Sequence, residues 1–415
     1  MSQTFAITLP DIEAAAGRIA GHVLRTPLVH SPRLSELLGA EVLVKHENMH
    51  ATASFKERGA ANKLLQLSEE ERKRGVIAMS AGNHAQAVAY HARRFGIPAT
   101  IVMPETTPLV KVENTRAQGA RIVLHGETLY ESGFKAREMA EAGDLVLIHP
   151  YDDPAIMAGQ GTMALEMLAD VPDLDVLIIP LGGGGLMAAN AIAAKAMRPD
   201  IEMIGSETEM FPAFQNALDG KERPIGGPTL AEGIAVKTVG ELTLPVIKAL
   251  VSDIVLVDEQ LIERAVNLYA GLHHTMAEGA GAVALAAMLK DPARFAGRKI
   301  GLVLSGGNID TRLLAAVMVR DLERENRIVS LRLTSNDYPG LLGKATSLLG
   351  AQGANILDVS HSRRFLDLPA KGVSIDLTIE TRGSAHVQEI EVALASAGFT
   401  VRRVRPQDFA KDSLG

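Results

Sequence analysis

The sequence predicts an open α/β fold for residues 1–322, followed by a smaller ferredoxin-like domain. Two observations lead to this fold class. Up to about residue 322, short β-branched runs alternate with Ala-rich helical stretches, and beyond it the expected order becomes β-α-β-β-α-β. The first pattern indicates parallel strands joined by right-handed helical crossovers, and the second is the split βαβ arrangement.

The apolar runs of the first region are continuous rather than alternating, as expected of parallel strands that are covered on both faces. We expect strands at residues 76–79, 99–102, 121–124, 145–148, 176–179, 202–205, 254–257 and 300–304. We expect helices between them, at residues 83–95, 128–141, 186–197 and 259–272.

A charged segment at residues 321–327 is short of core residues, which suits an exposed domain boundary. We therefore expect a linker at residues 323–327 and a second domain at residues 328–410. Its strands are expected at residues 328–334, 356–363, 372–380 and 400–405, and its helices at residues 341–351 and 386–397.

Composition excludes several classes of function. The 415 residues include 42 Lys and Arg against 49 Asp and Glu, for a net charge of −7, and no cysteine. A mildly acidic, mixed surface argues against a nucleic-acid or membrane partner. The lack of cysteine excludes disulfides, cysteine-ligated zinc, iron–sulfur clusters and thiol nucleophiles. With no visible secretory signal or membrane span, we expect a soluble, cytoplasmic protein.

The most reactive-looking segment is residues 53–60, ASFKERGA, in which Lys56 follows Phe55 at an expected loop-to-helix junction. A lysine held against an apolar wall has a lowered pKa, and its free amine can form an imine with a carbonyl. The alternative is an ordinary solvated lysine near a helix start.

A second segment, residues 80–86 (SAGNHAQ), directly follows an expected strand. Ligands of open α/β sheets bind at the carboxyl ends of strands, and the first N–H groups of a helix there attract an anion. A small carboxylate is therefore a natural ligand for this junction. Plain helix capping by Ser80 or Asn83, with His84 on the surface, is the alternative.

Four consecutive glycines, Gly182, Gly183, Gly184 and Gly185, come before Leu186 and after the strand at residues 176–179. They let backbone N–H groups close around phosphate oxygens at a helix N-terminus. The spacing matches neither the dinucleotide nor the nucleoside-triphosphate motif, so a phosphate on a compact ligand is favoured. The alternative is a structural loop packed against a neighbouring strand.

Residues 305–308 (SGGN) follow the last strand of the first region. Ser305 could hydrogen-bond a bound ring, although the segment reads equally well as a turn. Three of the four segments end expected parallel strands and the fourth opens a helix, so together they could line one crevice. An imine-forming lysine, a phosphate cradle and a hydroxyl for a ring nitrogen together describe pyridoxal 5′-phosphate as the cofactor.

In these motifs, and in residues 229–236 (TLAEGIAV), the chain resembles the fold-type II pyridoxal-phosphate enzymes over residues 5–320, most closely the threonine dehydratases, or threonine ammonia-lyases. The resemblance implies a tryptophan synthase β-like fold with two open α/β domains. In that fold a small domain of about residues 50–150 is inserted in the large one. It also implies a role in amino-acid metabolism such as isoleucine biosynthesis.

The resemblance assigns a role to each matching residue. Lys56 would be the Schiff-base lysine and general base, Phe55 would pack on the pyridine ring, and Ser305 would meet the ring nitrogen. The glycine loop from Gly182 to Leu186 would hold the phosphate. Asn83 would contact the ring hydroxyl and lie with Ser80, Gly82 and His84 around the substrate carboxylate.

The implied reaction is β-elimination of L-threonine to 2-oxobutanoate and ammonia, with L-serine giving pyruvate. A neutral Ser305 beside the pyridine makes the ring a weaker electron sink than a carboxylate would, which favours rapid loss of the β-hydroxyl. The substrate is therefore expected to be a small β-hydroxy amino acid.

Three alternatives remain open. Serine racemases share the scaffold but use a second acid/base, usually Ser, where this chain has Ala81, which cannot transfer a proton. Hydroxyaspartate dehydratases also share the scaffold. A non-catalytic amino-acid sensor is the rival from another functional class, and Lys56 argues against it because a binding module needs no imine-forming amine.

No metal site is expected. Relatives with a divalent-cation site carry an acidic residue matching Glu207 and another six residues later, where this chain has Ala213. One carboxylate is a poor site for a hard cation that takes six to eight oxygen ligands.

The C-terminal domain resembles an ACT regulatory domain, with Asp337, Gly340 and Leu341 at the expected effector site between its first strand and first helix. The glycine allows close approach of a ligand, and the helix N-terminus can receive an amino-acid carboxylate. Isoleucine or valine is the expected effector, and a purely structural dimerisation module is the alternative. Since both domains resemble ones that commonly pair, we expect a homo-oligomer, a dimer or tetramer.

Overall fold

The computed structural model describes residues 5–362 and 372–404, and the chain divides into two compact units, residues 1–310 and 311–415. The second unit opens with helix α14 (Thr311–Arg324). The charged segment at residues 323–327, expected as the linker, thus overlaps the end of this helix and leads into strand β11. The exposed polar residues at the end of an amphipathic helix carry the same composition signal as a linker, which explains the offset of the boundary.

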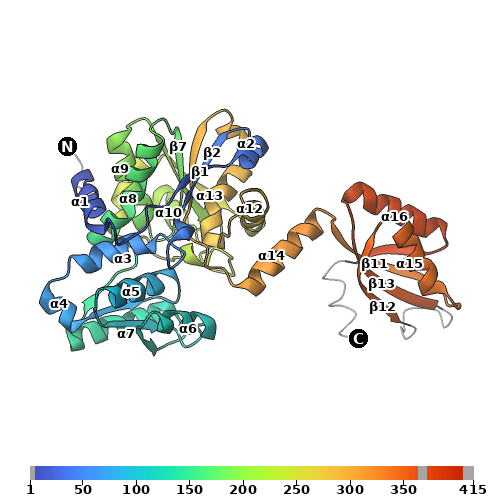
Figure 1. The fold of residues 1–415 in the computed structure, drawn as a ribbon, viewed down its shortest axis with the longest axis horizontal. Helices are drawn as coiled ribbons and strands as arrows, with labels where there is room; N and C mark the ends of the chain where they lie inside the picture. The colour runs from blue at the N-terminus through green and yellow to red at the C-terminus, as the bar shows by residue number, and fades with distance from the viewer. Residues whose placement is uncertain (1–4, 363–371, 405–415) are drawn as a thin grey trace. The chain divides into compact units, whose positions relative to one another are not determined.

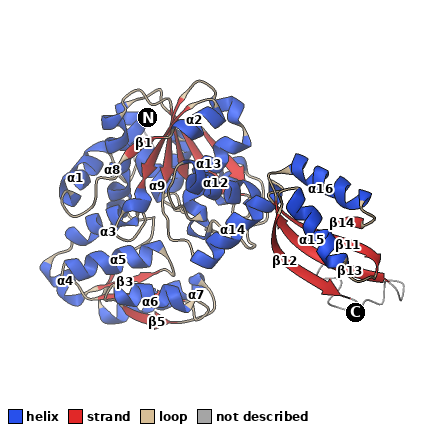
Figure 2. Ribbon diagram, turned by 45° about the vertical axis from the view of Figure 1, so that its right-hand side comes forward, coloured by secondary structure: helices blue, strands red, loops and turns tan. Residues whose placement is uncertain are grey.

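The first unit contains a larger sheet of six strands with helices on both sides (Figure 1, Figure 2). Its first strand pairs antiparallel with its neighbour and all other pairs are parallel. The spatial order is β1 (Leu28–His30), β2 (Glu41–His46), β10 (Lys299–Leu304), β7 (Val176–Pro180), β8 (Glu202–Thr208) and β9 (Asp253–Val257). Strands β1 and β2 are additions to the elements expected from the sequence.

A second, fully parallel sheet of four strands lies within the first unit. Its order is β5 (Arg121–Leu124), β4 (Ala99–Met103), β3 (Val76–Met79) and β6 (Val146–Leu147). Each sheet has its own hydrophobic core, and these cores contain different buried residues. The first unit thus contains two open α/β parts, and the strands of the smaller sheet lie within residues 76–147.

Helices connect and cover these strands. In the first unit they are α1 (Leu9–Ile19), α2 (Pro32–Leu38), α3 (Lys56–Leu65), α4 (Glu69–Arg74), α5 (Asn83–Arg94), α6 (Leu109–Ala117), α7 (Leu129–Gly143), α8 (Pro154–Asp170), α9 (Gly185–Met197), α10 (Ala213–Asp219), α11 (Thr243–Leu250), α12 (Glu259–Leu272) and α13 (Gly279–Lys290). Three short 3₁₀ turns are η1 (Glu47–Met49), η2 (Glu232–Ile234) and η3 (Pro292–Phe295). Within the described residues, no helix is long and apolar enough to cross a membrane.

Helix α3 lies between the two cores of the first unit. Ala60 and Leu64 are buried in the core of the smaller sheet, while Phe55, just before the helix, packs against the core of the larger sheet. Helix α8 contributes to both cores as well, through Ile156 and Met157. The two helices therefore join the two sheets.

The second unit has the order β11 (Ile328–Asn336), α15 (Leu341–Ala351), β12 (Asn355–Ser362), β13 (Gly372–Glu380), α16 (Ser384–Ser396) and β14 (Thr400–Val404). Its antiparallel sheet is ordered β12-β13-β11-β14 and buries one apolar core, which confirms the ferredoxin-like arrangement. The expected strand ends at residues 363 and 405, and domain residues 405–410, lie outside the described residues.

The carboxyl ends of three strands carry the sequence motifs. Ser80 follows β3, the glycine loop follows β7, and Ser305 follows β10. Strands β7 and β10 are neighbours in the larger sheet, whereas β3 belongs to the smaller one. The candidate site is therefore assembled from both sheets.

Candidate active site

Lys56 is the first residue of α3, and the chain just before it runs beside the end of β10. Ser54 forms an antiparallel bridge with Gly306, and the Phe55 backbone N–H donates to the Ser305 carbonyl at 3.0 Å. These contacts fix the Lys56 backbone beside Ser305, although some 250 residues separate the two in sequence. The crevice expected from the sequence thus contains at least these two groups.

The Lys56 side chain is partly buried, and its amine is held by the protein. Its Nζ donates to the Pro150 carbonyl at 2.7 Å and lies 5.1 Å from the centroid of the Phe55 ring. Burial lowers the pKa of Lys56 to about 8, and the nearby carboxylate of Glu278 opposes that shift. Near neutral pH a useful fraction of this amine is uncharged and nucleophilic.

The glycine loop needs glycine at each position. A Cβ on Gly183 would lie 2.2 Å from the Tyr151 ring, and one on Gly182 would lie 2.9 Å from the backbone of Ile234. Gly184 has φ +91°, a conformation that side chains disfavour. The loop leads into α9, a helix of 13 residues, so its first N–H groups form a cradle for an anion.

Leu186 follows this cradle inside α9. Its side chain is buried in the core of the larger sheet. Contact between Leu186 and a phosphate would therefore be made by its backbone N–H.

The segment after β6 connects Lys56 to the glycine loop. Pro150 accepts the Lys56 hydrogen bond, and the ring of the next residue, Tyr151, lies over Gly183. The Tyr151 hydroxyl donates to the Thr238 carbonyl at 3.3 Å, which holds the ring in place. The structure therefore brings the lysine and the glycine loop to the two sides of one short segment, which the sequence analysis did not identify.

Asn83, the first residue of α5, is held by two side chains from the larger part. Its Nδ2 donates to Oε1 of Glu278 at 2.7 Å, and its Oδ1 accepts from Nδ2 of Asn308 at 2.8 Å. These contacts fix the orientation of the Asn83 amide and join the second motif to the fourth.

Glu278 is a site residue that the sequence analysis missed. Burial raises its pKa to about 7, although the Asn83 amide stabilises the charged form. Its backbone N–H donates to the Gly306 carbonyl at 3.1 Å, which places it against the Ser305 loop. The only local signal is an acidic residue before the Ala-rich stretch of α13, and that pattern is typical of an ordinary helix N-terminus.

Ser80, Gly82 and His84 lie at the start of α5. The Gly82 N–H donates to Oγ of Ser80 at 3.1 Å, and a Cβ on Gly82 would have nothing within 4 Å. The backbone here is therefore open to a ligand, and the first N–H groups of α5 are suited to a carboxylate.

His84 is buried and donates from Nε2 to the Ile148 carbonyl at 3.0 Å. Burial, together with the positive charge of Lys56, lowers the pKa of His84 to about 3. The ring is therefore neutral near neutral pH, and this hydrogen bond ties it to the strand end rather than leaving that nitrogen free for a ligand.

Ser305 is buried at the end of β10, and its hydroxyl makes only a long contact of 3.5 Å with the Ala280 carbonyl. A poorly satisfied buried hydroxyl is suited to a further hydrogen-bonding partner. Together with the Lys56 amine and the glycine cradle, this residue set fits pyridoxal 5′-phosphate.

Glu207 is fully engaged by the backbone. Its Oε1 accepts from the Phe214 N–H at 2.8 Å and its Oε2 from the Gln215 N–H at 2.9 Å, at the start of α10. Burial raises the pKa of Glu207 to about 7. Ala213 opens the same helix and brings no carboxylate. Among the described residues no cluster of three or more His, Cys, Asp and Glu could hold a metal ion.

In the second unit, the expected effector residues lie between β11 and α15. Gly340 has φ +86°, and a Cβ there would have nothing within 4 Å, so the backbone is accessible. Asp337 is exposed, whereas the Leu341 side chain is buried in the core. Of the three, Asp337 and the Gly340 backbone present groups to solvent.

Comparison with known proteins identifies the family of this chain. Residues 19–306 match the family model described as pyridoxal-phosphate dependent enzyme. The chain is 43% identical to the L-threonine ammonia-lyase of Thermotoga maritima over 96% of its own length and 100% of that relative.

Solved structures give the same family. Maize serine racemase has a TM-score of 0.72 at 35% identity, covering 78% of this chain and all of that one. Threonine deaminase isoform 2 of Solanum lycopersicum has a TM-score of 0.71 at 36% identity, covering 75% of this chain and 86% of that one. This chain belongs to the family of pyridoxal-phosphate dependent enzymes.

Proposed function

We propose that this protein is a pyridoxal-phosphate-dependent L-threonine ammonia-lyase that forms 2-oxobutanoate and ammonia, and that also converts L-serine to pyruvate. The observation that carries the proposal is the buried Lys56 amine, with its pKa lowered to about 8, beside Ser305 and the segment that packs on the glycine loop. The relative named L-threonine ammonia-lyase, which matches nearly the whole chain, supports the substrate.

When bound, pyridoxal 5′-phosphate supplies an aldehyde that reacts with amines and a ring that draws electrons from the substrate Cα. The glycine loop would hold its phosphate through backbone N–H groups of α9, and Phe55 would pack on its ring. The neutral Ser305 hydroxyl would meet the ring nitrogen without forcing it to stay protonated. The Asn83 amide, oriented by Glu278 and Asn308, would contact the ring hydroxyl.

Residues of the protein would then bind the substrate and remove its Cα proton. The start of α5, with Ser80 and Gly82, would receive the substrate carboxylate and orient the amino acid. The Lys56 amine, whose uncharged fraction is increased by the lowered pKa, would take the proton from Cα as general base. Loss of the β-hydroxyl follows, so an amino acid without a β-leaving group is not a substrate.

Lyase chemistry is favoured over racemisation because Ala81 cannot deliver a proton. Racemisation needs a donor on the face of Cα opposite Lys56, and the residue after Ser80 offers only a methyl group. Glu278 is another titratable group close to Lys56, but it already accepts the Asn83 hydrogen bond. Hydroxyaspartate stays a candidate substrate because it carries the same β-hydroxyl.

The second unit would act as an ACT-like regulatory domain that binds isoleucine or valine at the turn containing Asp337 and Gly340. Its ferredoxin-like arrangement and the open backbone at Gly340 support this assignment. The L-threonine ammonia-lyase that matches 96% of the chain also extends over this region. Effector binding here would change the affinity for threonine, and threonine would change the affinity for the effector by the same factor. We also propose that the protein forms a homo-oligomer.

Replacing Lys56 tests the catalytic assignment. Lys56→Ala should lose the absorbance of the bound cofactor at ~410 nm and lower ammonia release from L-threonine by about 1,000-fold or more, because it removes both the covalent attachment and the base. Lys73→Ala, an exposed lysine of α4, is the control and should leave both measurements unchanged. Full ammonia release by Lys56→Ala would contradict the mechanism, and no ammonia release by the unaltered protein would support the sensor alternative.

The lowered pKa of Lys56 predicts a pH dependence for cofactor uptake. Only the neutral amine attacks an aldehyde, so uptake by cofactor-free protein should be slow below pH 8 and rise as the pH passes through the Lys56 pKa of about 8. Stopped-flow absorbance at a series of pH values measures the rate of cofactor uptake. A midpoint at the value of a solvated lysine, ~10.4, would mean that the amine is not buried in solution.

Product analysis distinguishes the lyase from its relatives. With L-serine, pyruvate should form at least ~10-fold faster than D-serine, because Ala81 cannot reprotonate Cα. Chiral chromatography and a coupled pyruvate assay measure the two rates. Racemisation faster than elimination would overturn the assignment, and a kcat/KM for 3-hydroxyaspartate above that for threonine would change the substrate.

The effector turn can be tested in the full chain. Gly340→Ala strains a left-handed backbone position and places a methyl group in the open space at the N-terminus of α15. It should therefore weaken the response to isoleucine or valine by about 5-fold or more, the lower range of typical allosteric coupling. Gly398→Ala is a matched control, with φ +94° and open space in the same unit. If both variants responded equally to isoleucine or valine, the turn containing Gly340 would be excluded as the effector site.

A further inference from the structure

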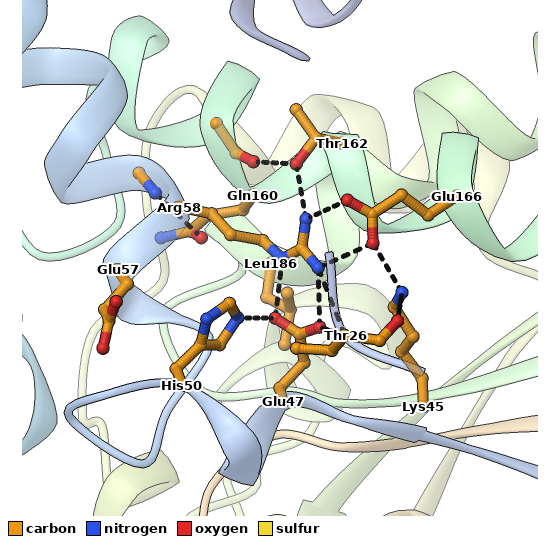
Figure 3. A network of polar contacts seen from close by, with 12 residues as sticks. Thr26, Lys45, Glu47, His50, Glu57, Arg58, Gln160, Thr162, Glu166 and Leu186 are labelled. Atoms are coloured by element: carbon orange, nitrogen blue, oxygen red, sulfur yellow. Dashed lines mark hydrogen bonds and ion pairs between the residues drawn. The ribbon is translucent and has the colours of Figure 1, made fainter. Parts of the chain in front are cut away.

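A network of charged and polar side chains lies at the start of α3, where this helix meets α8 (Figure 3). It joins the segment before β1, strand β2, the η1 turn, helix α3 and helix α8. Its members are Thr26, Lys45, Glu47, His50, Arg58, Thr162 and Glu166. The mechanism proposed above uses none of them.

Arg58 is the centre of this network and is fully buried. Its Nε and Nη2 donate to the two oxygens of Glu47 at 2.7 and 2.8 Å. Its Nη1 and Nη2 donate to the two oxygens of Glu166 at 2.7 and 2.8 Å. Thr162 and Thr26 accept further, longer bonds at 3.1 and 3.3 Å. Each of the three guanidinium nitrogens thus donates at least one hydrogen bond. The planar guanidinium can bind two carboxylates in this way, whereas a lysine ammonium cannot.

The carboxylates around Arg58 are tied to other elements. Glu47 also accepts from the Thr26 hydroxyl at 2.6 Å and contacts Nε2 of His50 at 2.9 Å. Glu166 also accepts from Nζ of Lys45 at 2.5 Å. Buried ion pairs of this kind add little net stability compared with apolar packing, but they require one specific geometry. A fixed geometry is therefore the clearest contribution of this network.

The helices meet closely where Arg58 lies. A Cβ on Gly159 would be 2.6 Å from the Arg58 carbonyl oxygen, and one on Gly59 would be 2.5 Å from the Gln160 side chain. The backbones of α3 and α8 are therefore in direct contact beside the guanidinium. Arg58 and Glu166 hold the two helices together at this crossing.

The Glu47–Arg58 ion pair also joins the two ends of the loop that leads into Lys56. Within this loop Ala53 has φ +51°, a left-handed conformation that is unfavourable for alanine. Such a conformation persists only where surrounding contacts impose it. On one side those contacts are the hydrogen bonds of Ala53 and Phe55 to the Ser305 loop, and on the other the Glu47–Arg58 pair.

We propose that Arg58 is a positioning residue for Lys56: by fixing the first turn of α3 to Glu47 and Glu166, it holds the Lys56 amine in its buried place against the Pro150 carbonyl. Lys56 lies only two residues before Arg58 in the same helical turn, so a rotation or shift of this turn moves the amine directly. This role rests on the function proposed for Lys56 above.

Arg58→Lys tests the role because it keeps the charge and removes the two-sided fork. In cofactor-free full-length protein, the pH dependence of Lys56 acylation by an amine-directed reagent, followed by mass spectrometry, reports the state of the amine. The midpoint should move upward from about 8, toward that of a solvated lysine, as the amine becomes more exposed. In the cofactor-loaded protein, kcat for L-threonine should fall about 10-fold or more while KM changes less than about 3-fold.

Two further variants complete the test. Glu166→Gln keeps the side-chain volume but weakens the paired hydrogen bonds from Arg58. It should raise the midpoint of Lys56 acylation and lower kcat, as Arg58→Lys does. It therefore tests the proposal even if Arg58→Lys does not fold. Lys63→Met is the matched control, since it removes a 2.7 Å ion pair with Asp153 from the same helix α3. It should leave the Lys56 midpoint unchanged and kcat within about 2-fold.

An unchanged Lys56 midpoint in a folded variant of Arg58 or Glu166 would overturn the proposal, whatever happens to kcat or thermal stability, because the network would then be only structural. The labelling measurement does not depend on turnover. If the unaltered protein released no ammonia from threonine, the proposed function would fail while the role of Arg58 would still be tested.

Discussion

The arrangement of the site depends on one antiparallel contact between segments that are far apart in the sequence. The bridge from Ser54 to Gly306 and the hydrogen bond from Phe55 to Ser305 bring the start of α3 to the end of β10. This contact places an amine and a hydroxyl side by side. Because the same loop also contacts Glu278 through the Gly306 carbonyl, it extends to Asn83 and the smaller sheet. Without it, the four motifs would be separate strand ends.

Burial sets the protonation behaviour of the titratable groups at the site. Burial lowers the pKa of the partly buried Lys56 amine and of the buried His84 ring, and it raises the pKa of the partly buried Glu278 carboxyl. Arg58 and Glu47 show the opposite case. Both are fully buried, yet their direct pairing outweighs burial, so the pKa of Glu47 lies well below its usual value. The protein thus keeps full charge in its supporting network, whereas a fraction of the Lys56 amine at the reacting position is uncharged near neutral pH.

Much of the fold and part of the site could be predicted from the sequence, because their signals are local. The continuous apolar runs gave the parallel strands, and lysine, glycine and serine at strand or helix ends marked Lys56, the glycine loop and Ser305. Strand β2 was missed because its short apolar run is flanked by Glu41, Lys45 and His46, which is typical of an exposed segment. In the structure Lys45 is buried and paired with Glu166. Glu278 and Pro150 were missed because an acidic residue before a helix and a backbone carbonyl carry no distinctive pattern; only the folded chain brings them to Lys56.

The division of the site between two sheets has a consequence for how small molecules enter and leave. The glycine cradle, Lys56 and Ser305 belong with the larger sheet or its adjoining helix, whereas Ser80 and Gly82 follow a strand of the smaller one. Asn83 also lies on the smaller side, at the start of α5, and it is hydrogen-bonded to Glu278 and Asn308 of the larger side. Separating the two sheets to let a small molecule pass would therefore break these two hydrogen bonds, so access to the site and the orientation of the Asn83 amide are linked.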